Sequence, residues 1–241
     1  MANKTMTKKE ETQITTQIEI PDDYHLDFEQ DDIKTPSILL YQKMSDMIEF
    51  EDANVKAGDF VNPVTGEILG KEFEACIVRP FVTARVFGEP DESGRKTTIK
   101  FSRDGKFWDT GERIQPSEFA WKEDGSHALK SYHYLVVVKG SDMPAMVTFR
   151  GASAKFAKTL NANLMYMKPA WRTWFKFSSA VEEKGGNKYH VIQSKAQPQD
   201  TIDPETAVLA LNLYESMVKG ATVSSSDMDK EDFDGDSVSF E

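Results

Sequence analysis

The stretch Ser131-Tyr-His-Tyr-Leu-Val-Val-Val138 is the strongest strand signal in the chain, and the residues after it decide the fold. Aromatic and β-branched residues dominate it, as is typical of a strand. A turn rich in Gly, Ser and Pro leads to a second apolar run at 145–149, which predicts a hairpin. Apolar side chains then recur every four residues from Phe156, which predicts a helix over about 153–167.

Further strand signals lie on both sides of this hairpin and helix. Before it, we expect a hairpin over 60–69, a strand over 72–87 and another hairpin over 97–108. After it, we expect strands over 170–177 and 188–193.

A second helix is predicted near the C-terminus, from about Pro204 to Lys219. Asp203 is placed to act as its N-cap, Pro204 occupies the first helical position and Gly220 follows its end.

The order of strands, helix and two more strands predicts a β-rich α+β fold. We expect an OB-fold-like, partly open antiparallel barrel with one internal helix and a C-terminal helix, because that fold places a helix between its third and fourth strands. A sandwich or another small barrel fits the pattern as well. Composition predicts a disordered polar and acidic arm at 1–35, an OB-like domain at 36–220 and a disordered acidic tail at 221–241.

The charges are divided unevenly along the chain. The whole chain carries a formal charge of −11, but residues 130–200 hold eleven Lys or Arg against four Asp or Glu, which leaves +7 there. Residues 19–52 hold eleven acidic residues against two lysines. A basic middle between acidic flanks is the layout expected of a protein that binds a polyanion such as single-stranded nucleic acid.

The sequence gives little support for catalysis. Its only cysteine, Cys76, lies in an apolar strand and predicts a buried side chain rather than a zinc ligand or disulfide. The four histidines have no metal-ligand spacing, and neither a P-loop nor a Gly-x-Ser-x-Gly motif is present. We therefore expect a non-enzymatic protein without a cofactor. With no apolar run of membrane-span length and no secretory signal in this sequence, we also expect a cytoplasmic location.

Cations alternate with aromatic residues in several predicted strands and loops. Single-stranded nucleic acid is bound in this way, because bases stack on rings while Lys and Arg contact phosphates. In the predicted strand at 170–177, Trp174 shares a face with Arg172 and Lys176, and we expect that face to bind. The predicted DNA-binding residues are Arg79, Phe81, Arg85, Lys100, Arg103, Lys106, Trp108, Arg150, Lys155, Lys158, Lys168, Arg172, Trp174 and Lys176.

Arg150 has a second possible role. It lies just before the predicted helix at 153–167, whose free N-terminal N–H groups favour anions, so a phosphate site is possible there.

The acidic C-terminus contains aromatic residues that a merely solubilising tail does not need. We predict that it binds a protein partner or competes for the basic surface, through Asp232, Phe233, Asp234, Asp236 and Phe240. An EF-hand is excluded, because Asp232 or Ser237 stands where the loop requires Gly.

These features resemble those of phage single-stranded DNA-binding proteins. The resemblance runs from about Gly58 to Gln193 and rests on the basic-aromatic strands, on the segment 147–158 and on the strand pair beginning at Trp171 and Tyr189. It implies an OB-fold core, binding to single-stranded DNA during replication or recombination, and a tail that recruits a polymerase, helicase or recombinase. A homodimer is possible. The alternative is a protein–protein interaction module, either a virion component or a host-directed inhibitor that mimics DNA.

Overall fold

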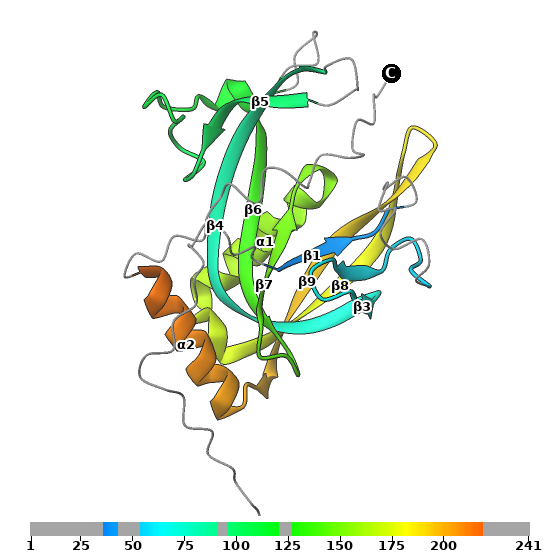
Figure 1. Ribbon diagram of the computed structural model, residues 1–241, viewed down its shortest axis with the longest axis vertical. Helices are drawn as coiled ribbons and strands as arrows, with labels where there is room; N and C mark the ends of the chain where they lie inside the picture. The colour runs from blue at the N-terminus through cyan, green and yellow to red at the C-terminus, as the bar shows by residue number, and fades with distance from the viewer. Residues whose placement is uncertain (1–35, 43–53, 91–95, 121–126, 219–241) are drawn as a thin grey trace, which may run out of the picture. The chain divides into compact units, whose positions relative to one another are not determined.

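The computed structural model describes residues 36–42, 54–90, 96–120 and 127–218, all within the unit Lys34–Glu241. Within these ranges, nine strands form one mixed sheet with two α-helices packed against it (Figure 1). The strand order is β3-β2-β1-β7-β6-β4-β8-β9, and β5 pairs with β4 beside this path. The fold is therefore β-rich α+β, as predicted.

The elements have the following bounds. The strands are β1 (Ser37–Leu40), β2 (Phe60–Asn62), β3 (Glu67–Gly70), β4 (Glu72–Pro90), β5 (Lys96–Ser102), β6 (Leu129–Val138), β7 (Pro144–Phe149), β8 (Thr173–Lys184) and β9 (Asn187–Thr201). The α-helices are α1 (Ala154–Tyr166) and α2 (Pro204–Val218), and three short 3-10 segments are η3 (Pro116–Phe119), η4 (Gly151–Ser153) and η5 (Ala170–Arg172).

The long strand β4 connects the parts of the sheet. Its first residues pair with β8, its middle pairs with β6 and its last residues pair with β5. Ala75 and Ile77 lie in one core cluster and Cys76 and Val78 in another. Because successive side chains of a strand point to opposite faces, this part of β4 is buried on both sides.

Helix α1 covers one face, which we call the inner face. Its buried residues, Ala157, Leu160 and Leu164, pack in the larger core cluster with apolar side chains of β4, β6, β7 and β8. The Tyr134 hydroxyl donates to Asn161 Oδ1 at 2.8 Å, so β6 is tied to α1 by a polar contact as well. The helix ends before Pro169, whose ring disfavours helical backbone at the residue before it.

Helix α2 covers part of the opposite face, which we call the outer face. Leu209, Ala210, Leu213 and Met217 pack in a second cluster with outward side chains of β4, β6, β7 and β8. The predicted cap is confirmed, since Asp203 Oδ1 accepts the N–H of Thr206 at 2.8 Å. The backbone N–H and the side-chain hydroxyl of Thr206 also lower the pKa of the Asp203 carboxyl.

The sheet is not closed into a barrel, so the barrel prediction is wrong in that respect. The N-terminal strand β1 runs parallel to β7 and stands beyond it in the strand order, while β9 ends the other side of the sheet. Among the described residues, the Gln42 side chain links these two ends: its Nε2 donates to the carbonyl of His190 at 2.8 Å and its Oε1 accepts the N–H of His190 at 2.9 Å.

Some of the local secondary-structure predictions are confirmed and others are wrong. The hairpin at 60–69 is confirmed as β2 and β3, and the strand signal at 131–138 as β6. The hairpin at 97–108 is wrong, because β5 pairs with β4 instead and Phe107 forms an isolated bridge with Arg113. The predicted arm at 1–35 and tail at 221–241 lie outside the described residues.

Candidate nucleic-acid interface

Three side chains form a row across the outer face, at the border of the cluster that α2 covers, against which Phe81 still packs. Phe81 of β4 lies opposite His133 of β6, which in turn lies opposite Thr148 of β7. The Phe81 and His133 rings are stacked, with centroids 4.9 Å apart and planes 19° apart. The row therefore presents a half-buried ring on a rigid aromatic support.

His133 is held from both sides by threonines. Its Nε2 lies 2.8 Å from Thr83 Oγ1 and its Nδ1 lies 2.9 Å from Thr148 Oγ1. Burial, together with the nearby positive charges of Arg85 and Arg150, lowers the pKa of His133 to about 3. The imidazole is therefore neutral at physiological pH, and the charge of this surface comes from the two arginines.

We call this surface the outer-face patch and define it by the following residues. Its members are Phe81, Thr83, Arg85, His133, Thr148 and Arg150, and Arg79 stands at its border with α2. Arg79 Nη1 donates to the carbonyl of Met217 at 3.2 Å, which places the end of α2 beside the patch.

Members of the patch differ in exposure. Arg150 is exposed and Phe81 and Thr148 are half-buried, whereas Arg85 is 6% exposed and lies over the Phe87 ring at 5.7 Å. A ligand on this surface would thus meet Arg150 and Phe81 first. It would reach the Arg85 guanidinium only after its surroundings rearrange.

The segment after β5 contributes a second group of cations. Lys100 is half-buried with its Nζ 3.9 Å from Glu112, while Arg103 and Lys106 are exposed. Asp104 Oδ1 accepts the N–H groups of Lys106 at 2.7 Å and Phe107 at 3.0 Å, so the turn is well ordered locally. These bonds also lower the pKa of the Asp104 carboxyl.

The aromatic residue available in that segment is Phe107 rather than Trp108. Trp108 is 3% exposed, packs with Ala84 and Ile114 and donates its Nε1–H to Glu118 at 3.1 Å. The predicted use of Trp108 as an exposed stacking ring is therefore wrong. Phe107 is 48% exposed between the same cations, and only its alternation with the core residue Trp108 signals this in the sequence.

The predicted exposure of Trp174 is also wrong. The ring is 2% exposed and packs in the outer-face cluster with α2, and Lys139 Nζ lies over it at 5.3 Å. Of its predicted companions, Arg172 precedes the strand in η5, whereas Lys176 follows Trp174 by two residues in β8, as expected, and pairs with Glu72 at 2.7 Å. The strand does present Phe175 and Phe177 to the inner core, as expected.

The remaining predicted cations lie near α1, away from the outer-face patch. Lys155 forms an ion pair with Glu182 at 2.6 Å and Lys158 is exposed on the same helix. Lys168 and Arg172 are exposed in the connection from α1 to β8. The structure thus separates the predicted residues into at least two surfaces.

The start of α1, where a phosphate site was predicted, has a different local structure from the one expected. Arg150 is exposed and precedes η4, which comes before α1. Ser153 makes no cap hydrogen bond, because its Oγ accepts the N–H of Ile192 at 3.0 Å. Ser153 therefore anchors β9 instead of capping the helix.

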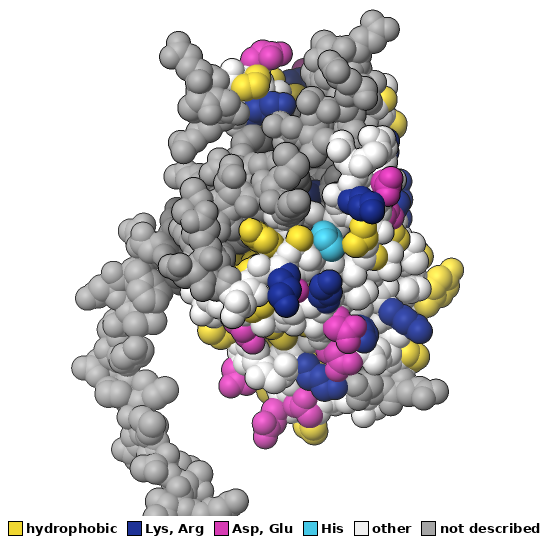
Figure 2. All heavy atoms as spheres, turned by 90° about the vertical axis from the view of Figure 1, so that its right-hand side faces the viewer, with side chains coloured by type: hydrophobic (Ala, Val, Ile, Leu, Met, Phe, Trp, Pro, Cys, Tyr) yellow, Lys and Arg dark blue, Asp and Glu magenta, His cyan; other side chains and the backbone are white. Residues whose placement is uncertain are grey.

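Figure 2 shows a face on which Lys and Arg side chains are interspersed with Asp and Glu side chains. Such mixed charge does not attract a polyanion strongly, since neighbouring opposite charges cancel over a Debye length. The coloured part of this view is thus unlike the outer-face patch, whose charged members are all arginines.

Two features of the described ranges bear on other functions. There, His, Cys, Asp and Glu side chains form no group of three suited to a metal ion. None of the helices in those ranges is long and apolar enough to cross a membrane.

Comparison with known proteins gives one match. No curated protein and no solved structure matches the chain. The family model described as Pam3 phage gp34-like protein matches residues 17–223, most of the chain. The chain therefore belongs to the Pam3 phage gp34-like family of bacteriophage proteins.

Proposed function

We propose that this phage protein binds single-stranded DNA with little sequence preference, without catalysis, during phage DNA replication or recombination. The observation that carries the proposal is the outer-face patch, where a stacked ring pair is flanked by Arg85 and Arg150. A ring accepts any base by stacking, and the exposed Arg150 contacts phosphate, so neither contact reads sequence. Arg85 contributes its positive charge from beneath the surface.

The strand connectivity supports this choice of surface. Setting aside the appended strands, β4, β6, β7, β8 and β9 follow one another with α1 between the third and fourth. We infer an OB-like core that β1 holds open beside β7. In OB-folds the outer face of the second and third strands and the adjoining loops bind oligonucleotides. Here those strands are β6 and β7, which carry His133 and Thr148.

The segment after β5 extends the proposed surface. It belongs to the connection from β4 to β6, the loop between the first and second strands of the proposed core. Phe107, Arg103 and Lys106 are exposed there. We infer that they hold nucleotides beyond those contacted by the patch.

We further propose that the acidic tail competes with DNA for the patch and recruits a replication protein. The support is that Val218, the last described residue, follows Met217, whose carbonyl accepts from Arg79 at the border of the patch. Opposite charges attract tail and arginines. Deleting residues 227–241 should raise the affinity for DNA, and unchanged or weaker affinity of the truncated protein would remove the competition.

The binding proposal is tested with a fluorescently labelled dT oligonucleotide and its anisotropy. Intrinsic tryptophan fluorescence is a poor reporter, because Trp108 and Trp174 are buried. The informative variant is Arg150→Gln and its matched control is Lys158→Gln, since each removes one exposed cation. We expect a steep salt dependence for the wild type and a slope smaller by about 0.7 for Arg150→Gln only.

A wild type that does not bind the oligonucleotide would contradict the proposal. Equal losses in the two variants would show that net charge, rather than the patch, governs binding. The second candidate function, a protein–protein interaction module, would then be favoured, and the exposed apolar side chains of α2 would be the observation behind it.

A further inference from the structure

A hydrogen-bonded chain of three side chains runs through the outer-face patch. Thr83 Oγ1 lies 2.8 Å from His133 Nε2, and His133 Nδ1 lies 2.9 Å from Thr148 Oγ1. Thr83 is 3% exposed and His133 is 2% exposed, whereas Thr148 is half-buried, so the chain begins inside the protein and ends at its surface. The direction of its hydrogen bonds therefore decides what the surface end offers to a ligand.

The neutral imidazole of His133 carries one N–H, on either Nδ1 or Nε2. In one tautomer Nε2–H donates to Thr83 Oγ1, and the buried Thr83 hydroxyl hydrogen then has no acceptor among the described residues. In the other tautomer the Thr83 hydroxyl donates to Nε2, and Nδ1–H donates to Thr148 Oγ1. Because buried donors are nearly always paired, the network selects the second tautomer.

This tautomer fixes the role of the Thr148 hydroxyl. Its oxygen accepts from His133, and within the described part of the chain its hydrogen has no acceptor. Thr148 is half-buried, so that hydrogen is directed to solvent or to a ligand. With the opposite tautomer the hydroxyl would donate inward to Nδ1 and offer a ligand only its lone pairs.

A cation lies on the same side of the chain as this hydroxyl. Arg150 follows Thr148 by two residues, is exposed and has extended backbone, with φ −136° and ψ 170°. Residues two apart in an extended chain lie on one face, about 7 Å from each other. A hydroxyl donor beside a guanidinium suits a phosphate group, since Thr and Arg side chains both contact phosphates in complexes with nucleic acid.

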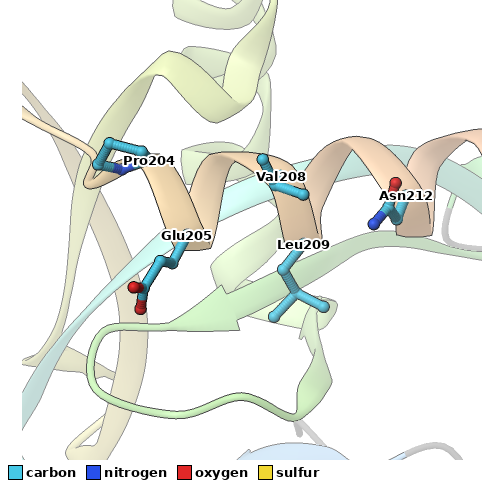
Figure 3. Close-up of a pocket in the computed structure, with 5 residues that line it drawn as sticks. All are labelled: Pro204, Glu205, Val208, Leu209 and Asn212. Atoms are coloured by element: carbon cyan, nitrogen blue, oxygen red, sulfur yellow. The ribbon is translucent and has the colours of Figure 1, made fainter. Parts of the chain in front are cut away.

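The groove beside α2 is not an alternative place for a phosphate. It has a volume of about 460 Å³ and is lined by Pro204, Glu205, Val208, Leu209 and Asn212. Glu205 is the one charged residue among these five, and Figure 3 shows it pointing to the same side of the helix as Leu209. A carboxylate repels phosphate, so the outer-face patch is the better site.

We propose that Thr148 binds a phosphate of the DNA strand through its hydroxyl, which the chain from Thr83 through His133 holds as a donor. Thr83 and His133 are positioning residues, since they act through Thr148. This inference rests on the proposed function, because the phosphate belongs to the bound single strand. The tautomer of His133, in contrast, is a property of the free protein.

The tautomer is therefore tested first, without DNA. The wild type is labelled with 15N-histidine and its ring nitrogens are observed by NMR at pH 7, and the variant His133→Asn identifies the signals that belong to His133. We expect a protonated Nδ1 and an unprotonated Nε2. A protonated Nε2 overturns the proposal.

The phosphate contact is tested by anisotropy with the labelled dT oligonucleotide. Thr148→Val removes the hydroxyl and should weaken binding about tenfold, because a hydrogen bond to a charged group is lost. Thr148→Ser keeps the hydroxyl and should bind nearly as the wild type does. Thr159→Val is the matched control, since Thr159 is exposed on α1. Equal affinities of Thr148→Val and Thr159→Val overturn the proposal.

The salt dependence separates a direct contact from a structural effect. A neutral hydroxyl releases no counterion, so Thr148→Val and the wild type should show parallel salt dependences. A slope smaller by about 0.7 for Thr148→Val would mean that the contact of Arg150 is lost as well, and would overturn a direct role of the hydroxyl. Thermal unfolding of each variant verifies that it folds.

An abasic strand separates a phosphate contact from a contact with a base. At low salt, Thr148→Val should lose affinity by the same factor for an oligonucleotide of abasic deoxyribose units as for dT. A loss confined to dT would place the hydroxyl on a base carbonyl and overturn the phosphate assignment. A wild type that binds neither strand removes this contact together with the proposed function, whereas the NMR result for His133 is unaffected.

Discussion

The outer face of β4, β6 and β7 has two halves that differ in what covers them. In one half, Cys76, Leu135 and Trp174 are buried in an apolar cluster with side chains of α2. Burial raises the pKa of the Cys76 thiol to about 11, so that thiol is unreactive. In the other half, the same strands carry Phe81, His133 and two arginines. An aromatic residue beside cations is thus buried in the core or left partly exposed according to what packs on it.

The largest expected effect belongs to the covered half. Trp174→Ala should reduce the free energy of unfolding by about 3–5 kcal/mol, because it leaves a cavity between the sheet and α2. Urea unfolding followed by circular dichroism measures this change. If stability were unchanged while DNA affinity fell, Trp174 would be a binding residue after all and the contrast between the halves would fail.

Phe107 tests the exposed segment that follows β5. Phe107→Ala should weaken binding to the dT oligonucleotide by about 1–3 kcal/mol through lost base stacking. Ile99→Ala is the matched control, since Ile99 is also exposed, at 62%, but has no ring to stack. Equal affinities of the two variants would remove Phe107 from the proposed surface.

His133 links the half that carries the outer-face patch to the pH dependence of stability. Its folded pKa is lowered, so as pH falls below about 6.5 the unfolded chain takes up a proton that the folded chain refuses. Stability should therefore decrease between about pH 6.5 and pH 3, by up to about 1.4 kcal/mol per pH unit.

The variant His133→Asn should be less stable than the wild type at pH 7 but lose less stability on acidification. Urea unfolding at pH 7 and pH 5 measures both quantities. His190, whose pKa is also lowered, is present in both proteins and cancels in the comparison. Parallel losses in the two proteins would show that His133 is not the buried neutral group inferred here.

The smallest expected effect lies on α1. Lys155→Gln removes an exposed ion pair with Glu182 and should change the free energy of unfolding by less than about 1 kcal/mol. It should also leave DNA affinity nearly unchanged beyond the loss of one net charge. An affinity loss larger than that of Arg150→Gln would move the binding surface to α1.

Much of the fold could be predicted because each strand carries its own signal. The apolar run at 131–138 and the cap at Asp203 needed no knowledge of distant residues. The position of β1 could not be predicted, because a four-residue strand depends on its tertiary neighbours. The pairing of β5 was also hidden, since the turn at 103–105 resembles a hairpin turn but β5 returns to β4.

The site was predicted in part, for a related reason. Arg79, Phe81 and Arg85 share a face of β4, as their period of two predicts, and Arg150, which follows β7, places its charge near His133. The burial of Trp108 and Trp174 was not predicted. The elements that cover them, η3 and α2, lie outside the short segments whose periodicity the prediction used. The stacked pair of Phe81 and His133 requires the register between β4 and β6, which local periodicity does not contain.

The account rests on DNA lying across the outer face of β4, β6 and β7, and photochemical crosslinking of a dT oligonucleotide followed by peptide mass spectrometry tests it most directly. We predict nucleotide adducts on Phe81 and Phe107. Tyr166 at the end of α1 is 88% exposed and serves as an internal reference for nonspecific contact. Adducts on Tyr166 with none on Phe81 or Phe107 would contradict the account.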